Sequence, residues 1–136
     1  MKNILIISLL LLLVGCSKSI DGELIFVEPR LDDQFNYPYF LFIPNGVSEH
    51  NTNYLIIEPN NSGFADDDLH KHQEKAKRIA TIDYYLGNWI ARKLTYPLIV
   101  PVFPRTESDW KTYTHALDRD VMIQKGNSLE RLDNQL

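Results

Sequence analysis

Serine, histidine and carboxylate side chains, which together can form a nucleophilic triad, lie close together in one part of the sequence. Ser62, Asp68 and His70 fall within one short stretch. A triad needs a histidine placed between the serine hydroxyl and the carboxylate. Sequence spacing does not fix that geometry, and a polar turn that leads into a helix explains the same residues. We therefore assign no catalytic residue here.

The histidines and aspartates of this stretch do not have the spacing of a metal site. His70 and His72 are two positions apart, so on a helix their side chains point about 200° from each other. Residues 66–68 are consecutive aspartates, whereas a calcium loop spaces its oxygen ligands at alternate positions. We expect no bound metal and no cofactor.

A second polar stretch, residues 105–126, follows Pro104. It contains His115 among charged residues, and it also carries Trp110 and Tyr113. Charged loop side chains are mostly solvated, which is the preferred interpretation over a substrate mouth. The alternative is a small binding module that presents these aromatic rings to a partner at a membrane surface.

The elements that must position these residues are predicted from hydrophobic patterning. Strands are expected where short apolar runs are rich in β-branched and aromatic residues, at 24–27, 39–43, 54–57 and 98–103. Runs without alternation, such as 40–43, indicate that helices cover both faces of the sheet. Between the second and third strands, Asn45-Gly46 favours an antiparallel hairpin with a long loop.

Residues 66–94 contain no proline and have apolar side chains near helical spacing, which predicts one long amphipathic helix. Asp66 is expected to cap its first turn. A strand, helix, strand order predicts a right-handed crossover, so the third and fourth strands should be parallel. Pro101 is expected to weaken the hydrogen-bond ladder of the fourth strand.

The last segment predicts a short second helix, since Asn127 can cap it and Glu130 can reach back to the first turn. A sheet of four strands with so little helix after it exposes an edge and an apolar face. We expect marginal stability or self-association.

The N-terminus has the order of a secretory signal: Lys2, an apolar run over 4–14, then Leu13-Val14-Gly15-Cys16. The apolar run is too short to span a bilayer, which needs about 20 helical residues. The four closing residues resemble the lipobox of bacterial lipoproteins. The resemblance implies that residues 1–15 are removed and that Cys16 is acylated. Two or more acyl chains are enough for stable membrane anchoring.

The rest of the chain is then expected to be a tether over 16–22 and a single domain over 23–136. Cys16 is the one cysteine, so no disulfide forms within the chain. Acidic residues outnumber basic ones, 18 to 14, and the basic residues are scattered, so nucleic acid is not an expected partner. Ser17 follows Cys16, which by the same resemblance suggests the outer membrane, with the body in the periplasm or at the cell surface.

Two motifs resemble the α/β-hydrolase superfamily, in particular its esterase-like bacterial members. The first is Glu58-Pro59-Asn60-Asn61-Ser62-Gly63 at the end of the third strand, and the second is 101–105 together with 113–120. The resemblance covers roughly 38–136. It implies an α/β fold, with a partial hydrolase-like sheet of about four strands, one long crossover helix and a short C-terminal helix. It also implies that Asn61 and Ser62 supply oxyanion-hole N–H groups.

The chain departs from that superfamily in one respect: it contains no G-x-S-x-G nucleophile elbow. Gly46-Val47-Ser48 is the nearest pattern, and it precedes a predicted strand instead of following one. The expected function is therefore a truncated, membrane-anchored lipoprotein that is related to serine hydrolases and inactive as this chain, because the nucleophile and catalytic histidine regions are missing. The alternatives are an exported esterase or peptidase, acting on a small ester or peptide once a missing C-terminal half completes it, and a small cell-envelope binding module.

Overall fold

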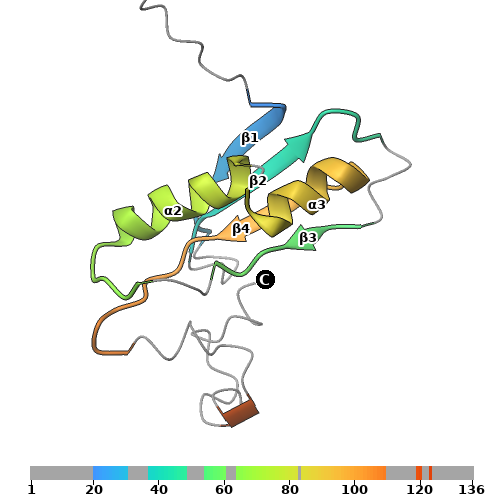
Figure 1. The fold of residues 1–136 in the computed structure, drawn as a ribbon. Coiled ribbons are helices and arrows are strands. Elements are labelled where there is room, and N and C mark those ends of the chain that lie inside the picture. The colour runs from blue at the N-terminus through green and yellow to red at the C-terminus, as the bar shows by residue number, and fades with distance from the viewer. Residues whose placement is uncertain are drawn as a thin grey trace, which may run out of the picture.

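The chain has a mixed α/β fold, in which a four-stranded sheet is packed against two helices (Figure 1). The structure is a computed structural model that describes residues 20–30, 37–48, 54–60, 64–82, 84–109, 119, 120 and 123. The strands are β1 (Gly22–Val27), β2 (Tyr39–Pro44), β3 (Ile56–Ile57) and β4 (Leu98–Pro101). All four lie where the apolar runs predict strands.

The strand order is β1-β2-β4-β3. β3 pairs with β4 in parallel, which confirms the prediction of a crossover connection. The predicted hairpin between the second and third strands is wrong. β4 lies between them, and β2 pairs antiparallel with β1 on one side and with β4 on the other. β2 is an interior strand, which agrees with the burial of Phe40 and Phe42. The chain returns through the helices, and β4 then pairs beside β2.

The crossover contains two helices, α2 (Leu69–Thr81) and α3 (Leu86–Leu94), so the prediction of one long helix is wrong. The backbone is extended at Ile82, with φ −101° and ψ 122°, and again at Tyr85, with φ −81° and ψ 137°. The side-chain amide of Asn88, which is fully buried, donates to the Ala80 carbonyl in the last turn of α2. Arg92 then bonds to both Asn88 and the Thr81 carbonyl. These side-chain bonds replace backbone bonds that a continuous helix would make.

α2 is capped by Asp68 and not by Asp66. The Asp68 carboxylate accepts from the backbone N–H of His70 at 2.9 Å. Asp66 instead lies in an isolated bridge with Arg105, in which its N–H donates to the Arg105 carbonyl at 2.8 Å. That bridge pairs Asp66 with Arg105 two residues before the N-cap of the helix, Asp68.

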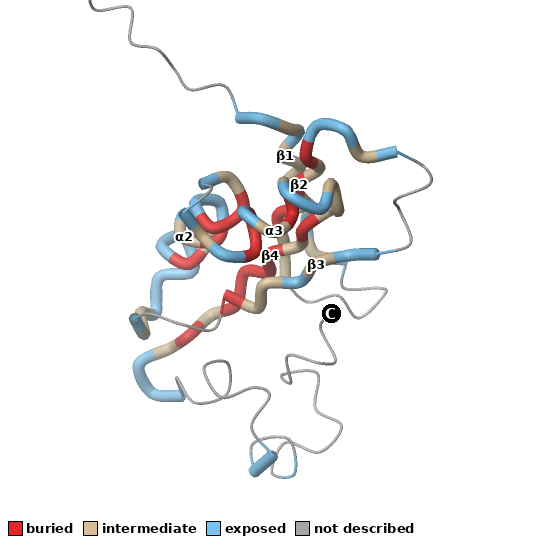
Figure 2. The backbone as a smooth tube through the Cα atoms, turned by 45° about the vertical axis from the view of Figure 1, so that its right-hand side comes forward, coloured by how far each residue is buried: buried red, intermediate tan, exposed pale blue. Residues whose placement is uncertain are grey.

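Both helices lie on the same face of the sheet, and the buried core is between them and the central strands (Figure 2). Alanines on the helices allow close approach to the large side chains of β2 and β4. The buried cluster consists of Phe40, Phe42, Ala76, Ile79, Ala80, Ala91, Leu98, Val100 and Val102.

The opposite face of the sheet carries a continuous apolar row. Ile25 is paired with Leu41, Leu41 with Ile99, and Ile99 with Ile57, so the four side chains cross the sheet side by side. The first three are half-buried, and Ile57 is 40% exposed. Among the described residues no helix covers this face, and the second helix that the sequence predicts lies outside them.

Several predictions concern residues outside the described ranges: the signal peptide, the acylated Cys16, and the short helix near Asn127. Among the described residues, no helix combines the length and apolarity needed to cross a bilayer.

Candidate functional site

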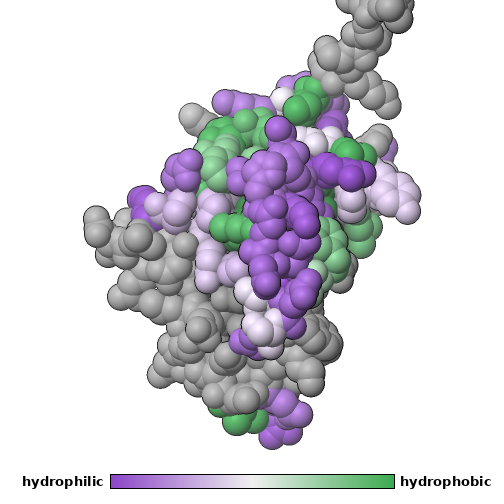
Figure 3. Space-filling view, turned by 90° about the vertical axis from the view of Figure 1, so that its left-hand side faces the viewer, coloured by the Kyte–Doolittle hydropathy of each residue, from purple (hydrophilic) through white to green (hydrophobic). Residues whose placement is uncertain are grey.

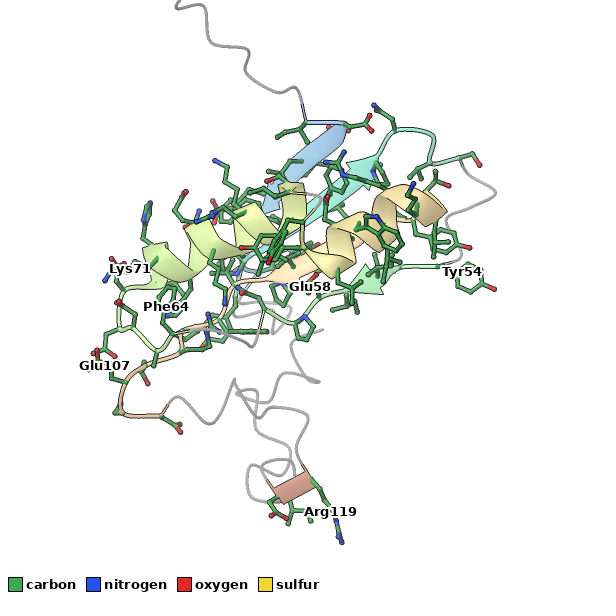
Figure 4. All side chains as sticks on the ribbon, in the orientation of Figure 1. Tyr54, Glu58, Phe64, Lys71, Glu107 and Arg119 are labelled. Carbon is green, nitrogen blue, oxygen red and sulfur yellow. The ribbon has the colours of Figure 1, made fainter. Side chains whose placement is uncertain are left out.

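β3 and β4 are parallel, so their carboxyl ends open onto the same edge of the sheet, where α2 also begins (Figure 1). In open α/β sheets, ligands bind in the crevice outside these strand ends. β3 leads into Glu58 and Asn60, and β4 leads into Arg105. Figure 4 shows Glu58 near the middle of the molecule and Phe64 at the end where α2 starts. The polar groups at this edge form the candidate site.

Asn60 makes the turn that follows β3. Its φ is 50°, a left-handed conformation that asparagine tolerates better than most residues. Its side-chain amide donates to the Pro101 carbonyl at 3.3 Å, which joins the end of β3 to the end of β4. The Oδ1 atom is buried and has no hydrogen-bond partner among the described residues. The two oxyanion-hole candidates, Asn61 and Ser62, follow directly and lie outside the described residues.

Arg105 and His72 form a buried pair behind this turn. The exposed fraction is 1% for Arg105 and 0% for His72. The His72 Nε2 atom lies 2.8 Å from the Asp66 carbonyl, to which it can only donate, so its Nδ1 atom is left as an acceptor. That acceptor lies 3.2 Å from Arg105, whose guanidinium donates to it. Burial lowers the pKa of Arg105 from its ordinary value.

Phe64 covers the same cluster. Its ring stacks on the His72 ring with the centroids 5.2 Å apart and 18° between the planes. The Arg105 guanidinium carbon is 5.9 Å from the Phe64 centroid, and the Lys75 ammonium nitrogen is 6.0 Å from it. Both cations are within the range of a cation–π interaction. One aromatic ring therefore contacts three nitrogen-bearing side chains.

Lys75 and Glu58 are a half-buried pair of opposite charge. Burial, with Arg105 adding to it, lowers the pKa of Lys75 to about 8, although Glu58 acts in the other direction. Burial raises the pKa of Glu58, against the opposing effects of Lys75 and of a hydrogen bond from the Gly87 N–H. The Gly87 nitrogen lies 2.8 Å from Glu58 Oε2. An acid and a base whose pKa values move toward neutrality are typical of functional sites.

A hollow of about 430 Å³ lies beside Lys75, between α2 and the start of α3. Figure 3 looks at the end of the molecule where α2 begins, and a hydrophilic band crosses this surface. The hollow combines two aromatic walls with charged side chains of α2; it is lined by Phe64, His70, Lys71, Glu74, Lys75, Arg78 and Tyr85. Its volume is within the range of small-molecule sites.

The residues weighed as a triad are not brought together as one. The Asp68 carboxylate is occupied by the backbone of His70, and Ser62 lies outside the described residues. The described residues contain no group of three or more side chains suited to hold a metal ion. His115, Trp110 and Tyr113 also lie outside the described ranges.

Sequence reasoning missed Glu58, His72 and Lys75 as site residues. His72 has the helical spacing of the buried residues Ala76 and Ile79, and it therefore resembles an apolar core position. The signal for Glu58 was present: it follows an apolar strand that precedes a helix, at the edge where ligands bind. Nothing in the sequence distinguishes Lys75 from the exposed lysines of α2.

Comparisons of the chain with protein-family models, with curated proteins and with solved structures give no match. The site is therefore interpreted from its own geometry. It contains a buried arginine–histidine pair, an acid and a base of shifted pKa, and an aromatic-walled hollow at the carboxyl edge of a parallel strand pair.

Proposed function

We propose that the chain is a lipid-anchored protein of the bacterial cell envelope whose body is related to serine hydrolases and does not hydrolyse substrates by itself. Two strands in an antiparallel pair, followed by a parallel pair with a helical crossover, support this relationship. Asn60 follows β3 and Arg105 follows β4, and these positions support the proposal. In the envelope, acyl chains on Cys16 hold the body at the outer membrane.

The observation that carries the proposal is the turn at Asn60. In α/β-hydrolases the loop after the third strand contributes an N–H to the oxyanion hole. The left-handed backbone at Asn60 and its side-chain bond to the Pro101 carbonyl support a turn at the end of β3. Asn61 and Ser62 would then polarise a carbonyl oxygen, with a small ester or peptide as the substrate class.

We expect no catalysis because Asn61 and Ser62 supply hydrogen-bond donors and no activated nucleophile. Without the elbow motif G-x-S-x-G, the printed sequence has no serine on a strand-to-helix turn to attack the carbonyl. An oxyanion hole stabilises a transition state but forms no acyl-enzyme. The alternative, an active esterase or peptidase, needs a second polypeptide segment to provide the nucleophile and the histidine.

Two measurements test the proposal. The first is sequencing of the DNA downstream of the coding sequence, and the second is an activity assay of the purified full chain. We expect a reading frame that encodes G-x-S-x-G followed by an acid and a histidine, and no labelling of this chain by a fluorophosphonate probe. Co-expression with the downstream polypeptide should restore hydrolysis of a p-nitrophenyl ester. An unrelated downstream sequence contradicts the hydrolase relationship, and labelling of the chain alone contradicts its inactivity.

The anchor is tested separately by growing cells with an alkyne analogue of palmitate. We expect the label on the wild-type chain and on a Ser17→Ala control, and none on Cys16→Ser. The wild type should sediment with membranes and be released by detergent. Labelling that persists in Cys16→Ser would disprove anchoring through this thiol.

A further inference from the structure

We propose that the hollow between α2, Phe64 and Tyr85 binds a small carbonyl compound that carries an anionic group, with the Lys75 amine as the atom that bonds to the carbonyl carbon. This site uses neither Asn61 nor Ser62. Its test is therefore independent of the hydrolase relationship proposed above.

The position of Lys75 supports a reactive amine. It projects from α2 into the hollow, is half-buried, and lies against the Phe64 ring. The nearby Arg105 guanidinium disfavours a second positive charge, and burial acts in the same direction. A lysine that is desolvated in a partly apolar pocket next to another cation is the known arrangement for an amine nucleophile.

Lys71 lines the same hollow as Lys75, but its amine is in a different electrostatic environment. Its ammonium group forms an ion pair with Asp66, and this partner raises the pKa of Lys71. Lys71 therefore remains protonated where Lys75 is partly neutral. Two lysines in one hollow thus have opposite reactivity, and attack on a carbonyl is assigned to Lys75 alone.

Glu58 does not itself line the hollow, but its charge acts on Lys75, so we assign to it the acid and base functions that the reaction needs. The neutral Lys75 nitrogen adds to the carbonyl carbon to form a carbinolamine, which then loses water to give an imine. The carboxyl form of Glu58, favoured by burial, can donate a proton to the departing hydroxyl, and its carboxylate can take back the proton that leaves nitrogen. The sum is amine plus carbonyl giving imine plus water, with no oxidant or reductant.

The remaining charged groups select an anionic ligand. Arg78 lines the hollow on the same helix as Lys75 and supplies a fixed positive charge, with Glu74 as the one carboxylate among the lining residues. Phe64 and Tyr85 form apolar walls for the body of the ligand. A phosphate or carboxylate held by Arg78 would place a carbonyl on the same small molecule near Lys75.

The test uses pyridoxal 5′-phosphate, an aldehyde with a phosphate group, on the full chain, followed by sodium borohydride reduction and peptide mapping. We expect Lys75 to carry at least tenfold more reduced adduct than Lys77, which is exposed on α2 and does not line the hollow. Half-maximal labelling is expected near pH 8. Inorganic phosphate in excess should reduce labelling of Lys75 and leave the labelling of Lys77 unchanged.

Two lysine variants test whether the adduct forms at Lys75. Lys75→Arg should remove the adduct at this position, whereas the matched variant Lys77→Arg should leave Lys75 labelling unchanged. The wild-type peptide map decides the question even if Lys75→Arg fails to fold. Equal labelling of all lysines overturns the proposed amine, and labelling of Lys75 that phosphate does not reduce overturns the anionic part of the ligand.

Discussion

The Gly87 N–H donates to the Glu58 carboxylate at 2.8 Å, in a contact so close that a side chain at residue 87 would have to displace that carboxylate. A Cβ atom built there overlaps Glu58 Oε2. Gly87 is fully enclosed at the start of α3, and Glu58 follows β3. This contact therefore fixes how α3 approaches the edge strand and holds the carboxylate near Lys75.

Gly87→Ala is expected to destabilise the fold by about 1–3 kcal/mol, the usual effect of overpacking an enclosed site. Alanine favours helix over glycine by about 1 kcal/mol, so the steric overlap has to exceed that gain. Urea denaturation monitored by circular dichroism measures the difference. In the Glu58→Ala background the same substitution should be neutral or stabilising, because the overlapping carboxylate is gone; equal destabilisation in both backgrounds would rule out this contact as the cause.

Lys75→Met is expected to change how stability depends on pH. The pKa of Lys75 is about 8 in the folded chain, below its ordinary value of 10.5. Between these values the unfolded chain binds the proton more tightly, so the wild type should gain stability relative to Lys75→Met as pH rises from 7 to 10. A Lys71→Met series should have the opposite slope at high pH, because Asp66 raises the pKa of Lys71. Parallel stability curves for Lys75→Met and the wild type would contradict the prediction.

Glu58→Gln tests how the raised pKa of Glu58 affects the dependence of stability on pH. Because burial raises the pKa of Glu58 above 4.5, the folded chain holds this proton more tightly than the unfolded chain. The wild type should therefore lose stability relative to Glu58→Gln as pH rises from 4 through the folded pKa. Asp66→Asn provides the opposite case, since Lys71 lowers the pKa of Asp66 and its contribution is lost as the pH falls. Urea denaturation across this pH range measures both differences.

The strands could be predicted from the sequence because runs such as those around Phe40 and Val100 are apolar, β-branched or aromatic, and short. The parallel pairing of β3 with β4 followed from the helical crossover. The break between α2 and α3 could not be predicted in this way, because Ile79, Ile82 and Leu86 keep near-helical spacing across it. At the break, the Asn88 side chain donates to the Ala80 carbonyl, a contact that helical periodicity does not predict.

The candidate site was harder to predict than the fold. Shifts in pKa at Lys75 and Glu58 arise from burial and from neighbours distant in sequence, such as Arg105 and Gly87. The helical spacing of apolar residues does not predict which distant residues contact Lys75 and Glu58. The sequence shows His72 as one of two helix histidines that cannot share a metal ion, whereas its partners in the structure are a backbone carbonyl and a buried arginine.

His72→Ala is expected to destabilise the chain by about 2–5 kcal/mol, because it removes a buried ring and the acceptor that Arg105 uses. His72→Phe keeps a ring in the buried position but removes the hydrogen bonds. It therefore separates the contribution of packing to stability from that of the hydrogen bonds. We expect His72→Phe to remain destabilised by about 1–3 kcal/mol, the typical effect of leaving a buried polar group unsatisfied. Chemical denaturation measures both variants. Wild-type stability in His72→Phe would show that the bond to Arg105 contributes little.

Ile57→Lys is expected to reduce self-association of a fragment that spans residues 17–136. Ile57 lies on the edge strand β3, is 40% exposed, and ends the apolar row formed with Ile99 and Leu41. Exposed apolar edges promote pairing between chains, and a lysine on an edge strand opposes it. Sedimentation velocity over a range of concentrations should show a smaller average mass for Ile57→Lys than for the wild type. Lys77→Glu, a change on the exposed surface of α2, is the control. A wild type that remains monomeric at all concentrations would contradict the predicted association, since this apolar row would then not bring two chains together.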